Sequence, residues 1–260
     1  MQVSDLDLLI DAARMAGEIA LREKARGLDV EHKADDAGPV TQADYAVDNA
    51  LRESLTASRP DYGWLSEETE DDASRLGTER VFIVDPIDGT RSFVKGEATW
   101  AHSLAVVENG IVTQGVVYLP EMNLLYSASI TQGAFCNGDQ IHVSDTADID
   151  DARVLATKPN MDPIHWRDAV PGFARSHRPS LAYRLCLVAQ GRYDAMLTFR
   201  PSWEWDIAAG ALILSEAGAR VSNRSGEDLR FNNRMPQTDG VLGAGQALHR
   251  RISDELVYTA

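Results

Sequence analysis

The sequence predicts an α+β fold in the first half of the chain and an α/β fold in the second. In the first half, residues 101–107 and 111–119 are β-rich runs on either side of an Asn-Gly dipeptide, which suits a tight hairpin turn. In the second half, expected strands alternate with expected helices, the order of elements found in α/β proteins. The acidic, non-periodic segment 145–151 separates the two patterns, so we place the boundary between sub-domains 1–147 and 148–260 there.

Two helices are expected near the start of the chain, each preceded by a residue suited to cap it. Ser4 and Thr41 carry hydroxyl groups that can accept a hydrogen bond from a first turn, and apolar residues follow each at helical spacing. Gly27 is the expected stop of the first helix, and Asp44 lies in the first turn of the second. The other elements expected in this half are strands at 30–33, 81–84 and 124–127, a loop at 35–39, a helical turn at 90–94, a turn at 120–123 and a connection at 133–138.

The second half contains β-favouring runs that predict strands and helically spaced apolar residues that predict helices. Gly191 and Gly218 follow two of the expected helices, where glycine commonly ends a helix. The expected strands are 154–157, 193–199, 219–222 and 240–244, and the expected helices are 163–173, 181–190, 205–217 and 246 to about 256.

The composition is ordinary for a globular protein, but the charge balance is strongly acidic. Charged residues make up 25% and hydrophobic residues 44% of the 260 residues, and the formal net charge is −15. This charge argues against a nucleic-acid polymer or an anionic membrane as partner, because both are bound through Lys and Arg. A small phosphorylated substrate is compatible with it, since divalent cations locally reverse the charge of an acidic site.

The cysteines and the N-terminus indicate where the protein acts. Cys136 and Cys186 lie far apart in apolar surroundings and are expected to be reduced core residues. The N-terminus lacks the basic start and apolar run of a signal peptide, and no apolar stretch approaches the roughly 20 residues of a membrane span. We therefore expect a cytoplasmic protein.

Residues 81–90 form the most informative stretch of the chain. Four β-favouring residues lead into Asp85-Pro86-Ile87-Asp88-Gly89-Thr90, where Pro86 has a fixed φ and Gly89 lets the backbone approach a ligand closely. Asp85 and Asp88 are thereby held in one small concavity, which is costly for two carboxylates unless a cation lies between them. An isolated motif of this kind is usually only a strand followed by an acidic turn, so its context decides.

The context consists of three motifs in a fixed order. Glu67-Glu68, then Asp85-Pro86-Ile87-Asp88-Gly89-Thr90, then Trp205-Asp206-Ile207-Ala208-Ala209-Gly210 resemble the signature set of the inositol monophosphatase family of metal-dependent, lithium-sensitive phosphomonoesterases. The resemblance extends from about Lys33 to Gly245. It implies a layered αβαβα sandwich of the sugar-phosphatase type, with the catalytic cleft between the two halves.

The resemblance also implies two or three Mg²⁺ ions. One would be held by Glu67, Asp85 and the backbone carbonyl of Ile87, and another by Asp85, Asp88 and Asp206. Carboxylates crowded into a small volume need a hard cation that prefers oxygen ligands, and Mg²⁺ meets that need.

The residues that act on the substrate follow from the same resemblance. Glu67 and Thr90, with Asp44 behind them, would orient a water that attacks the phosphorus in line. An acidic residue in a first helical turn is usually only favourable helix electrostatics. Here the pattern Val40-Thr41-x-x-Asp44 matches the family, which favours a functional role. The expected substrate contacts are Asp88, Gly89, Thr90, Arg184, Arg200 and Asp206.

The sequences of three further segments resemble those of the 3′(2′),5′-bisphosphate nucleotidase branch of the family. These segments are 116–123, 180–191 and 204–206, and Phe199 occupies a position where inositol phosphatases commonly carry a Glu. We therefore expect conversion of 3′-phosphoadenosine 5′-phosphate to AMP and phosphate. Arg184 and Arg200 are the candidates for the second phosphate, since charge-assisted contacts are strong. The candidates for an apolar face against adenine are Phe199, Trp203 and Tyr183.

Other readings remain open at this point. Alternatively, the two arginines form ion pairs on the surface, and the three aromatic residues belong to the hydrophobic core. Inositol-1-monophosphatase is one alternative activity, and histidinol-phosphate phosphatase is another because those enzymes share the wording of residues 88–93. A sugar bisphosphatase is more remote. A catalytically dead regulator that binds phosphorylated ligands should have lost a ligand residue or Thr90, and this chain retains all of them. The family habit suggests a homodimer.

Overall fold

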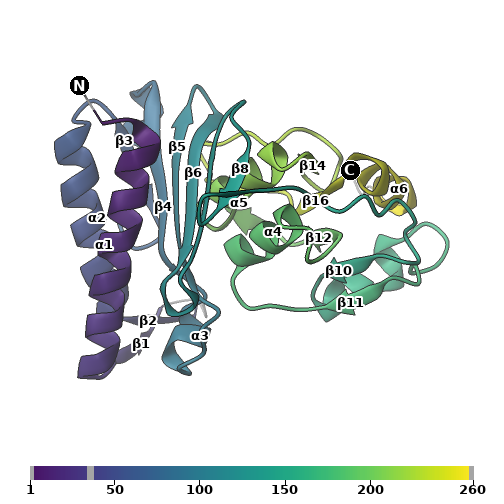
Figure 1. Cartoon of the computed structure of the whole chain (residues 1–260), viewed down its shortest axis with the longest axis horizontal. Coiled ribbons are helices and arrows are strands. Elements are labelled where there is room, and N and C mark those ends of the chain that lie inside the picture. The colour runs from purple at the N-terminus through teal and green to yellow at the C-terminus, as the bar shows by residue number, and fades with distance from the viewer. Residues whose placement is uncertain (1–2, 34–37, 258–260) are drawn as a thin grey trace.

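The computed structural model describes residues 3–33 and 38–257, which form five layers in the order αβαβα (Figure 1). An outer pair of helices covers one face of a first sheet, a second pair separates this sheet from another, and a last helix covers the far side. These helices are α1 (Asp5–Arg26) and α2 (Gln42–Ser58), α4 (Leu181–Ala189) and α5 (Glu204–Glu216), and α6 (Gln246–Glu255). The predicted sandwich is confirmed.

The first sheet has seven strands in the order β3-β4-β5-β6-β7-β8-β9. Their bounds are β3 (Gly63–Ser66), β4 (Arg80–Asp88), β5 (Ala101–Glu108), β6 (Ile111–Leu119), β7 (Leu124–Ser129), β8 (Ala134–Cys136) and β9 (Asp139–Ile141). All neighbours are antiparallel except β3 and β4, which are parallel. The predicted meander is confirmed, with the correction that the expected connection 133–138 contains β8.

The hairpin between β5 and β6 turns where the sequence predicts. Asn109 and Gly110 both have positive φ values, 51° and 82°, as a tight turn with the twist of a hairpin requires. Helix starts also agree with prediction: the Ser4 side chain accepts from Asp7 N, and Thr41 and Asp44 form a reciprocal capping box. Of the expected loop 35–39, residues 35–37 lie outside the described part, and Pro39 begins β2.

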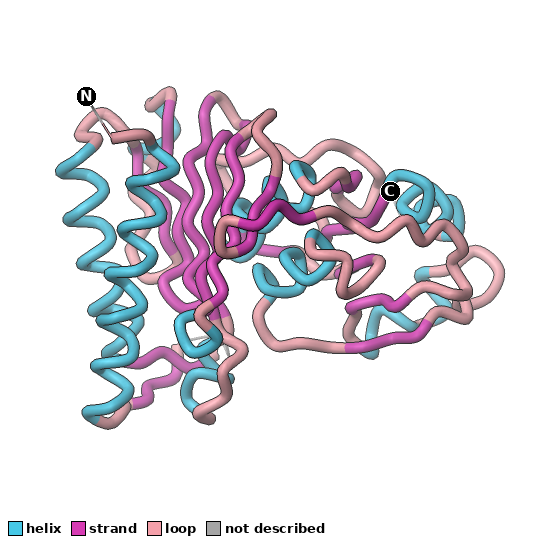
Figure 2. The backbone as a smooth tube through the Cα atoms, viewed as in Figure 1, coloured by secondary structure: helices cyan, strands magenta, loops and turns pink. Residues whose placement is uncertain are grey.

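The second sheet has five strands in the order β11-β10-β12-β16-β14. Its strands lie on the side of the molecule away from α1 and α2 (magenta, right in Figure 2). Their bounds are β10 (Arg153–Leu155), β11 (Ala174–Ser176), β12 (Ala195–Thr198), β14 (Ala219–Ser222) and β16 (Val241–Gly245). The first three are parallel, whereas β16 runs antiparallel to both of its neighbours. Two small sheets complete the fold and pair β1 (Val30–His32) with β2 (Pro39–Thr41), and β13 (Ser202–Trp203) with β15 (Gln237–Thr238).

The helix predicted at 163–173 is wrong. Only Pro163–His165 form a short 3₁₀ turn, and the rest is irregular. Trp166 instead forms an isolated antiparallel bridge with Leu256 and donates its indole N–H to the carbonyl of Asn160. The apolar residues that suggested a helix serve the packing of a loop, so tertiary contacts override the local pattern.

The middle helices α4 and α5 are covered on both sides. All nine residues of α4 are buried, and α5 is apolar on nearly all faces, as expected of a helix between two sheets. Cys136 and Cys186 are buried and free, as predicted. One core cluster contains residues of both sheets and of these helices. The division into sub-domains 1–147 and 148–260 stays a prediction.

Candidate metal centre and active site

The site is built on an irregularity in β4. Sequence analysis predicted that this strand ends at Val84, but it continues to Asp88 with a shift of register. Asp85 pairs with Ser103 and Asp88 pairs with Ala101 of β5. Two residues of β4 are bulged between these pairs because Pro86 has no N–H to offer the ladder.

Three carboxylates meet beside this bulge. Oxygen atoms of Asp85, Asp88 and Asp206 all lie within 4.8 Å of one another. Asp206 comes from the first turn of α5, so the middle helix layer brings the third motif to the second. Asp88 Oδ2 is held by the Ser180 hydroxyl at 2.6 Å and by Ala182 N–H at 2.7 Å. This arrangement brings together three of the predicted metal ligands.

The electrostatics of this cluster favour a bound cation. Burial raises the pKa of the Asp85 carboxyl well above its usual range, and the charges of Glu67, Asp88 and Asp206 raise it further. Burial likewise raises the pKa of Asp206. Among the described residues, Asp85 Oδ1 is buried with no hydrogen-bond partner. An orphaned carboxylate oxygen within an all-oxygen donor set fits a hard divalent cation such as Mg²⁺.

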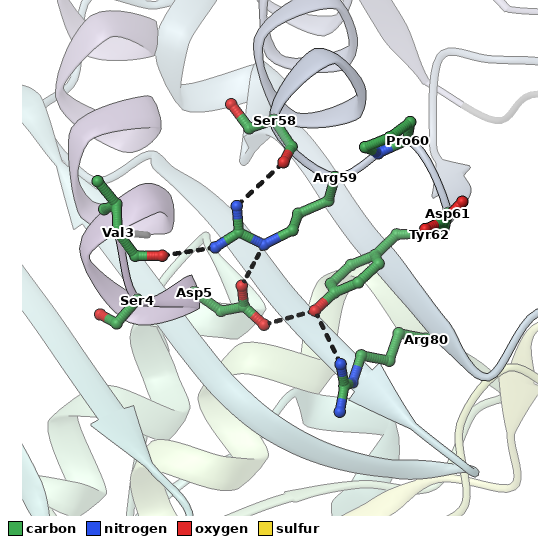
Figure 3. A pocket seen from close by; sticks show the side chains of 9 residues that line it. All are labelled: Val3, Ser4, Asp5, Ser58, Arg59, Pro60, Asp61, Tyr62 and Arg80. Carbon is green, nitrogen blue, oxygen red and sulfur yellow. Dashed lines mark hydrogen bonds and ion pairs between the residues drawn. The ribbon is translucent and has the colours of Figure 1, made fainter. Parts of the chain in front are cut away.

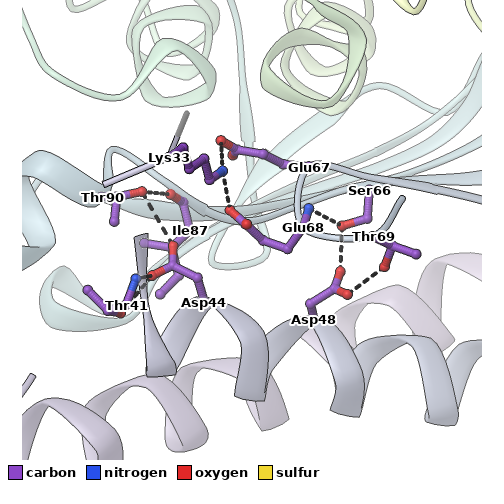
Figure 4. Close-up of polar contacts among 10 residues, drawn as sticks. All are labelled: Lys33, Thr41, Asp44, Asp48, Ser66, Glu67, Glu68, Thr69, Ile87 and Thr90. Atoms are coloured by element: carbon purple, nitrogen blue, oxygen red, sulfur yellow. Dashed lines mark hydrogen bonds and ion pairs between the residues drawn. The ribbon is translucent and has the colours of Figure 1, made fainter. Parts of the chain in front are cut away.

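Glu67 follows β3 and is paired with a lysine that sequence analysis did not single out for the site. Lys33 Nζ lies 2.7 Å from Glu67 Oε1 and 2.6 Å from Glu68 Oε1 (Figure 4). Burial and the charge of Glu67 raise the pKa of Glu68 to about 7. No sequence pattern marks Lys33 as a residue of the site, because its pairing with Glu67 and Glu68 depends on where the fold places the β1–β2 hairpin.

Asp44 and Thr90, both predicted to be catalytic, lie within hydrogen-bonding distance of each other. Thr90 Oγ1 lies 3.1 Å from the Ile87 carbonyl oxygen and 3.4 Å from Asp44 Oδ1 (Figure 4). Asp44 Oδ2 accepts from the N–H and the hydroxyl of Thr41. Burial raises the pKa of Asp44 to about 6. The Thr90 hydroxyl can donate to only one of its two acceptors at a time.

Gly89 connects β4 to α3 (Thr90–Val94) in a conformation that suits glycine. Its φ is 98°, and a Cβ at this position would lie 3.3 Å from the Thr99 carbonyl oxygen. The tight connection brings the start of α3 directly after Asp88. Gly89 therefore lies directly beside Asp88, and its contact with the substrate stays a prediction.

The predicted substrate arginines occupy different environments. Arg184 is buried, its Nε donates to the carbonyl of Arg178, and its Nη2 donates to that of Pro179 at 2.9 Å. Burial lowers the pKa of Arg184 to about 10, and the charge of Asp88 opposes this shift. Arg200 is exposed, and its charge opposes part of the rise in the Asp206 pKa that burial causes.

The three aromatic candidates for a contact with adenine also lie in different environments. Phe199 packs against His165 and Trp166, and Tyr183 is buried in α4, so both are core residues. Trp203 is 38% exposed and stacks on Trp205, with ring centroids 4.6 Å apart. Only Trp203 of the three candidates offers an open aromatic surface.

A buried network that sequence analysis missed supports the Glu67 loop. Asp48, one helical turn after Asp44 in α2, accepts hydrogen bonds from the hydroxyls of Ser66 and Thr69 (Figure 4). The helical spacing of Asp48 from Asp44 was the available signal, because residues four apart share a helix face.

A cavity of about 470 Å³ lies at the opposite end of β4 (Figure 3). Asp5 holds Arg59 at 2.8 Å and the Tyr62 hydroxyl at 2.8 Å, so its polar lining is internally paired. Arg80 at the start of β4 is separated from Asp88 by roughly 26 Å of strand. This cavity is therefore no part of the acidic site.

Comparison with known proteins shows the family of this chain. The sequence profile of the family described as the inositol monophosphatase family matches residues 2–258. The chain belongs to the inositol monophosphatase family. Its members are hydrolases of phosphoric monoesters, and the family is metal-dependent.

Individual members of the inositol monophosphatase family carry different names. A histidinol-phosphatase of Chlorobaculum parvum is 32% identical over 256 residues, 95% of each chain. The 3′(2′),5′-bisphosphate nucleotidase CysQ of Escherichia coli K12 is 31% identical over 237 residues, 88% of this chain and 94% of the relative. The solved structure of the Thermotoga maritima IMPase superimposes with a TM-score of 0.81 at 29% identity, covering 96% of this chain and 95% of that one.

No helix within residues 3–33 and 38–257 is both long enough and apolar enough to span a membrane.

Proposed function

We propose that this protein is a Mg²⁺-dependent phosphatase whose substrate is a 3′(2′),5′-bisphosphate nucleotide such as 3′-phosphoadenosine 5′-phosphate. The observation that carries the metal dependence is the largely buried cluster of Asp85, Asp88 and Asp206, with its unpartnered Asp85 Oδ1. Glu67, Asp85 and the Ile87 carbonyl would hold one ion. Asp85, Asp88 and Asp206 would hold another.

The residues around this cluster have separate tasks in hydrolysis. When bound, Mg²⁺ stabilises negative charge on the phosphoryl group and makes water a better nucleophile. The Thr90 hydroxyl orients the attacking water. This hydroxyl donates a hydrogen bond either to Asp44 Oδ1 or to the Ile87 carbonyl oxygen. The backbone N–H groups of Gly89 and Thr90 hold the phosphate, as amides at a tight turn can do.

The nucleotide preference is supported by the aromatic pair beside Asp206. Trp203 stacks on Trp205 with an interplanar angle of 9° and is 38% exposed, which suits contact with a planar base. Exposed Arg200 is the candidate for the second phosphate. Arg184 is bound to two backbone carbonyls, so we propose that it acts mainly by holding the loop before α4.

A second candidate substrate is histidinol phosphate. Two histidinol-phosphatases, from Chlorobaculum parvum and Mycobacterium tuberculosis, are each 32% identical to this chain over at least 93% of its length. Inositol 1-phosphate is the third candidate, since a plant inositol monophosphatase is 33% identical.

The test is phosphate release from these three substrates at saturating Mg²⁺, with kcat/KM measured for each. We expect the nucleotide bisphosphate to be preferred, EDTA to abolish activity and Li⁺ to inhibit it. A higher kcat/KM for inositol 1-phosphate or histidinol phosphate would overturn the substrate proposal. Full activity in EDTA would overturn the metal proposal.

We also propose a homodimer, as the family resemblance suggests, and a cytoplasmic location, as the composition of the N-terminal residues suggests. Light scattering of the purified protein tests the first point. A monomer at micromolar concentration would contradict it.

A further inference from the structure

At the bulge of β4, two residues of this strand face a single residue of β5. Between the pairs Asp85 with Ser103 and Asp88 with Ala101, Pro86 and Ile87 together oppose His102 alone. A bulge interrupts the ladder, so the carbonyl groups of the bulged residues need partners from outside it.

His102 supplies the partner for Pro86. Its Nδ1 is hydrogen-bonded to the Pro86 carbonyl oxygen, and because a carbonyl only accepts, Nδ1 carries the proton. The imidazole is fully buried, with its ring 5.4 Å from that of Trp100 and 6.4 Å from that of Tyr118. Within the described residues, His102 Nε2 has no hydrogen-bond partner. Among the described residues, the polar contact of the His102 ring is therefore its hydrogen bond to the Pro86 carbonyl oxygen.

The next carbonyl of the bulge is held by Thr90, whose Oγ1 lies 3.1 Å from the Ile87 oxygen. The peptide group between Pro86 and Ile87 is planar, so fixing the Pro86 oxygen also fixes the direction of the Ile87 N–H. Loss of either contact lets the bulge rotate. Such a rotation would move the Ile87 carbonyl and the carboxylates on both sides of it.

We propose that His102 is a positioning residue for the metal centre, because its hydrogen bond to the Pro86 carbonyl holds the bulge that directs Asp85, the Ile87 carbonyl and Asp88 to the cation. This inference rests on the proposed function, in which these three groups bind Mg²⁺. Partners that orient metal ligands typically contribute roughly 10–100-fold to metal affinity or activity.

Two substitutions separate positioning from packing. His102→Leu keeps most of the volume but has no donor, whereas His102→Asn loses volume but retains an N–H near the place of Nδ1. Mg²⁺ binding is measured by titration calorimetry and by the rise in unfolding temperature that Mg²⁺ produces. We expect His102→Leu to weaken Mg²⁺ binding about tenfold or more, and His102→Asn to weaken it less.

A packing role would change the stability of the variants and leave their Mg²⁺ binding unchanged. If His102→Asn loses more stability than His102→Leu and both bind Mg²⁺ as the unmutated protein does, the inference is overturned. Should His102→Leu not fold, His102→Gln replaces it, because the Gln amide reaches the place of Nε2 rather than Nδ1.

His249→Leu is the matched control. His249 is another buried histidine, hydrogen-bonded through Nε2 to the Ser222 hydroxyl at 2.9 Å beside the second sheet. We expect this variant to be less stable with unchanged Mg²⁺ affinity. Equal weakening of Mg²⁺ binding in His249→Leu and His102→Leu would overturn the inference. An unmutated protein that binds no Mg²⁺ would overturn the proposed function as well, whereas normal Mg²⁺ binding by His102→Leu overturns this inference alone.

Discussion

The ammonium group of Lys33 lies 2.7 Å from a carboxylate oxygen of Glu67, a proposed metal ligand. The same ammonium group pairs with Glu68 at 2.6 Å, and the Lys33 and Glu67 side chains are both largely shielded from solvent. Lys33 therefore neutralises acidic charge that a divalent cation would also neutralise.

Replacing Lys33 with Met should destabilise the metal-free protein and increase the stabilisation that Mg²⁺ provides. Removal of the ammonium group leaves the carboxylates of Glu67 and Glu68 to repel each other until a cation binds. Thermal unfolding with and without Mg²⁺ measures the difference. Lys24→Met is the control because Lys24 pairs with Glu121 at 2.6 Å elsewhere in the molecule. An equal Mg²⁺ effect in both variants would contradict this prediction.

Asp85→Asn should abolish phosphatase activity without unfolding the protein. We expect a loss on the order of 10²–10³-fold or more, as for the removal of one preorganised electrostatic group. Stability without metal should stay level or rise, because the substitution removes a charge that burial and neighbouring carboxylates disfavour. Phosphate release and chemical denaturation provide the two readouts.

Asp194→Asn should show the reverse behaviour and serves as the control for Asp85→Asn. Asp194 is a buried carboxylate paired with Arg153 at 3.1 Å, so its loss should lower stability and leave activity nearly unchanged. Retained activity of Asp85→Asn in Mg²⁺ would rule out its role as a ligand.

His249 should make folding sensitive to acid. Burial lowers its pKa from 6.5 to about 4, so below pH 6.5 the unfolded chain binds a proton that the folded protein does not. Its contribution is therefore constant above pH 6.5 and decreases as the pH falls toward 4, by up to about 3 kcal/mol. Unfolding free energies of the unmutated protein and His249→Leu, compared across this range, isolate the effect from that of the carboxylates. Parallel pH curves would show that His249 does not contribute.

Trp203→Ala should reduce kcat/KM for 3′-phosphoadenosine 5′-phosphate and not for inositol 1-phosphate. A base stacked on an aromatic ring gains about 1–3 kcal/mol, which corresponds to roughly 5- to 150-fold in kcat/KM. Met235→Ala is the control because Met235 is 65% exposed and has no proposed role. Equal losses for both substrates would indicate that Trp203 supports the fold rather than the base.

The sequence alone determined several of the local elements and predicted the acidic residues of the site. Ser4, Thr41 and the Asn109-Gly110 turn act through hydrogen bonds and φ angles within a few residues, so their pattern is sufficient to predict them. The acidic residues of the three motifs were likewise predictable from their order along the chain. The match of the family profile confirms the resemblance on which their proposed roles depend.

The tertiary structure decided how those residues meet and what holds them. The convergence of Asp206 with Asp85 depends on α5 lying between two sheets. The pairing of Lys33 with Glu67 and the hydrogen bond from His102 to Pro86 depend on strand register. Such contacts join residues far apart in sequence, and their energy comes from burial and packing that no local pattern encodes. The same reason explains why the apolar residues of 163–173 pack as a loop rather than a helix.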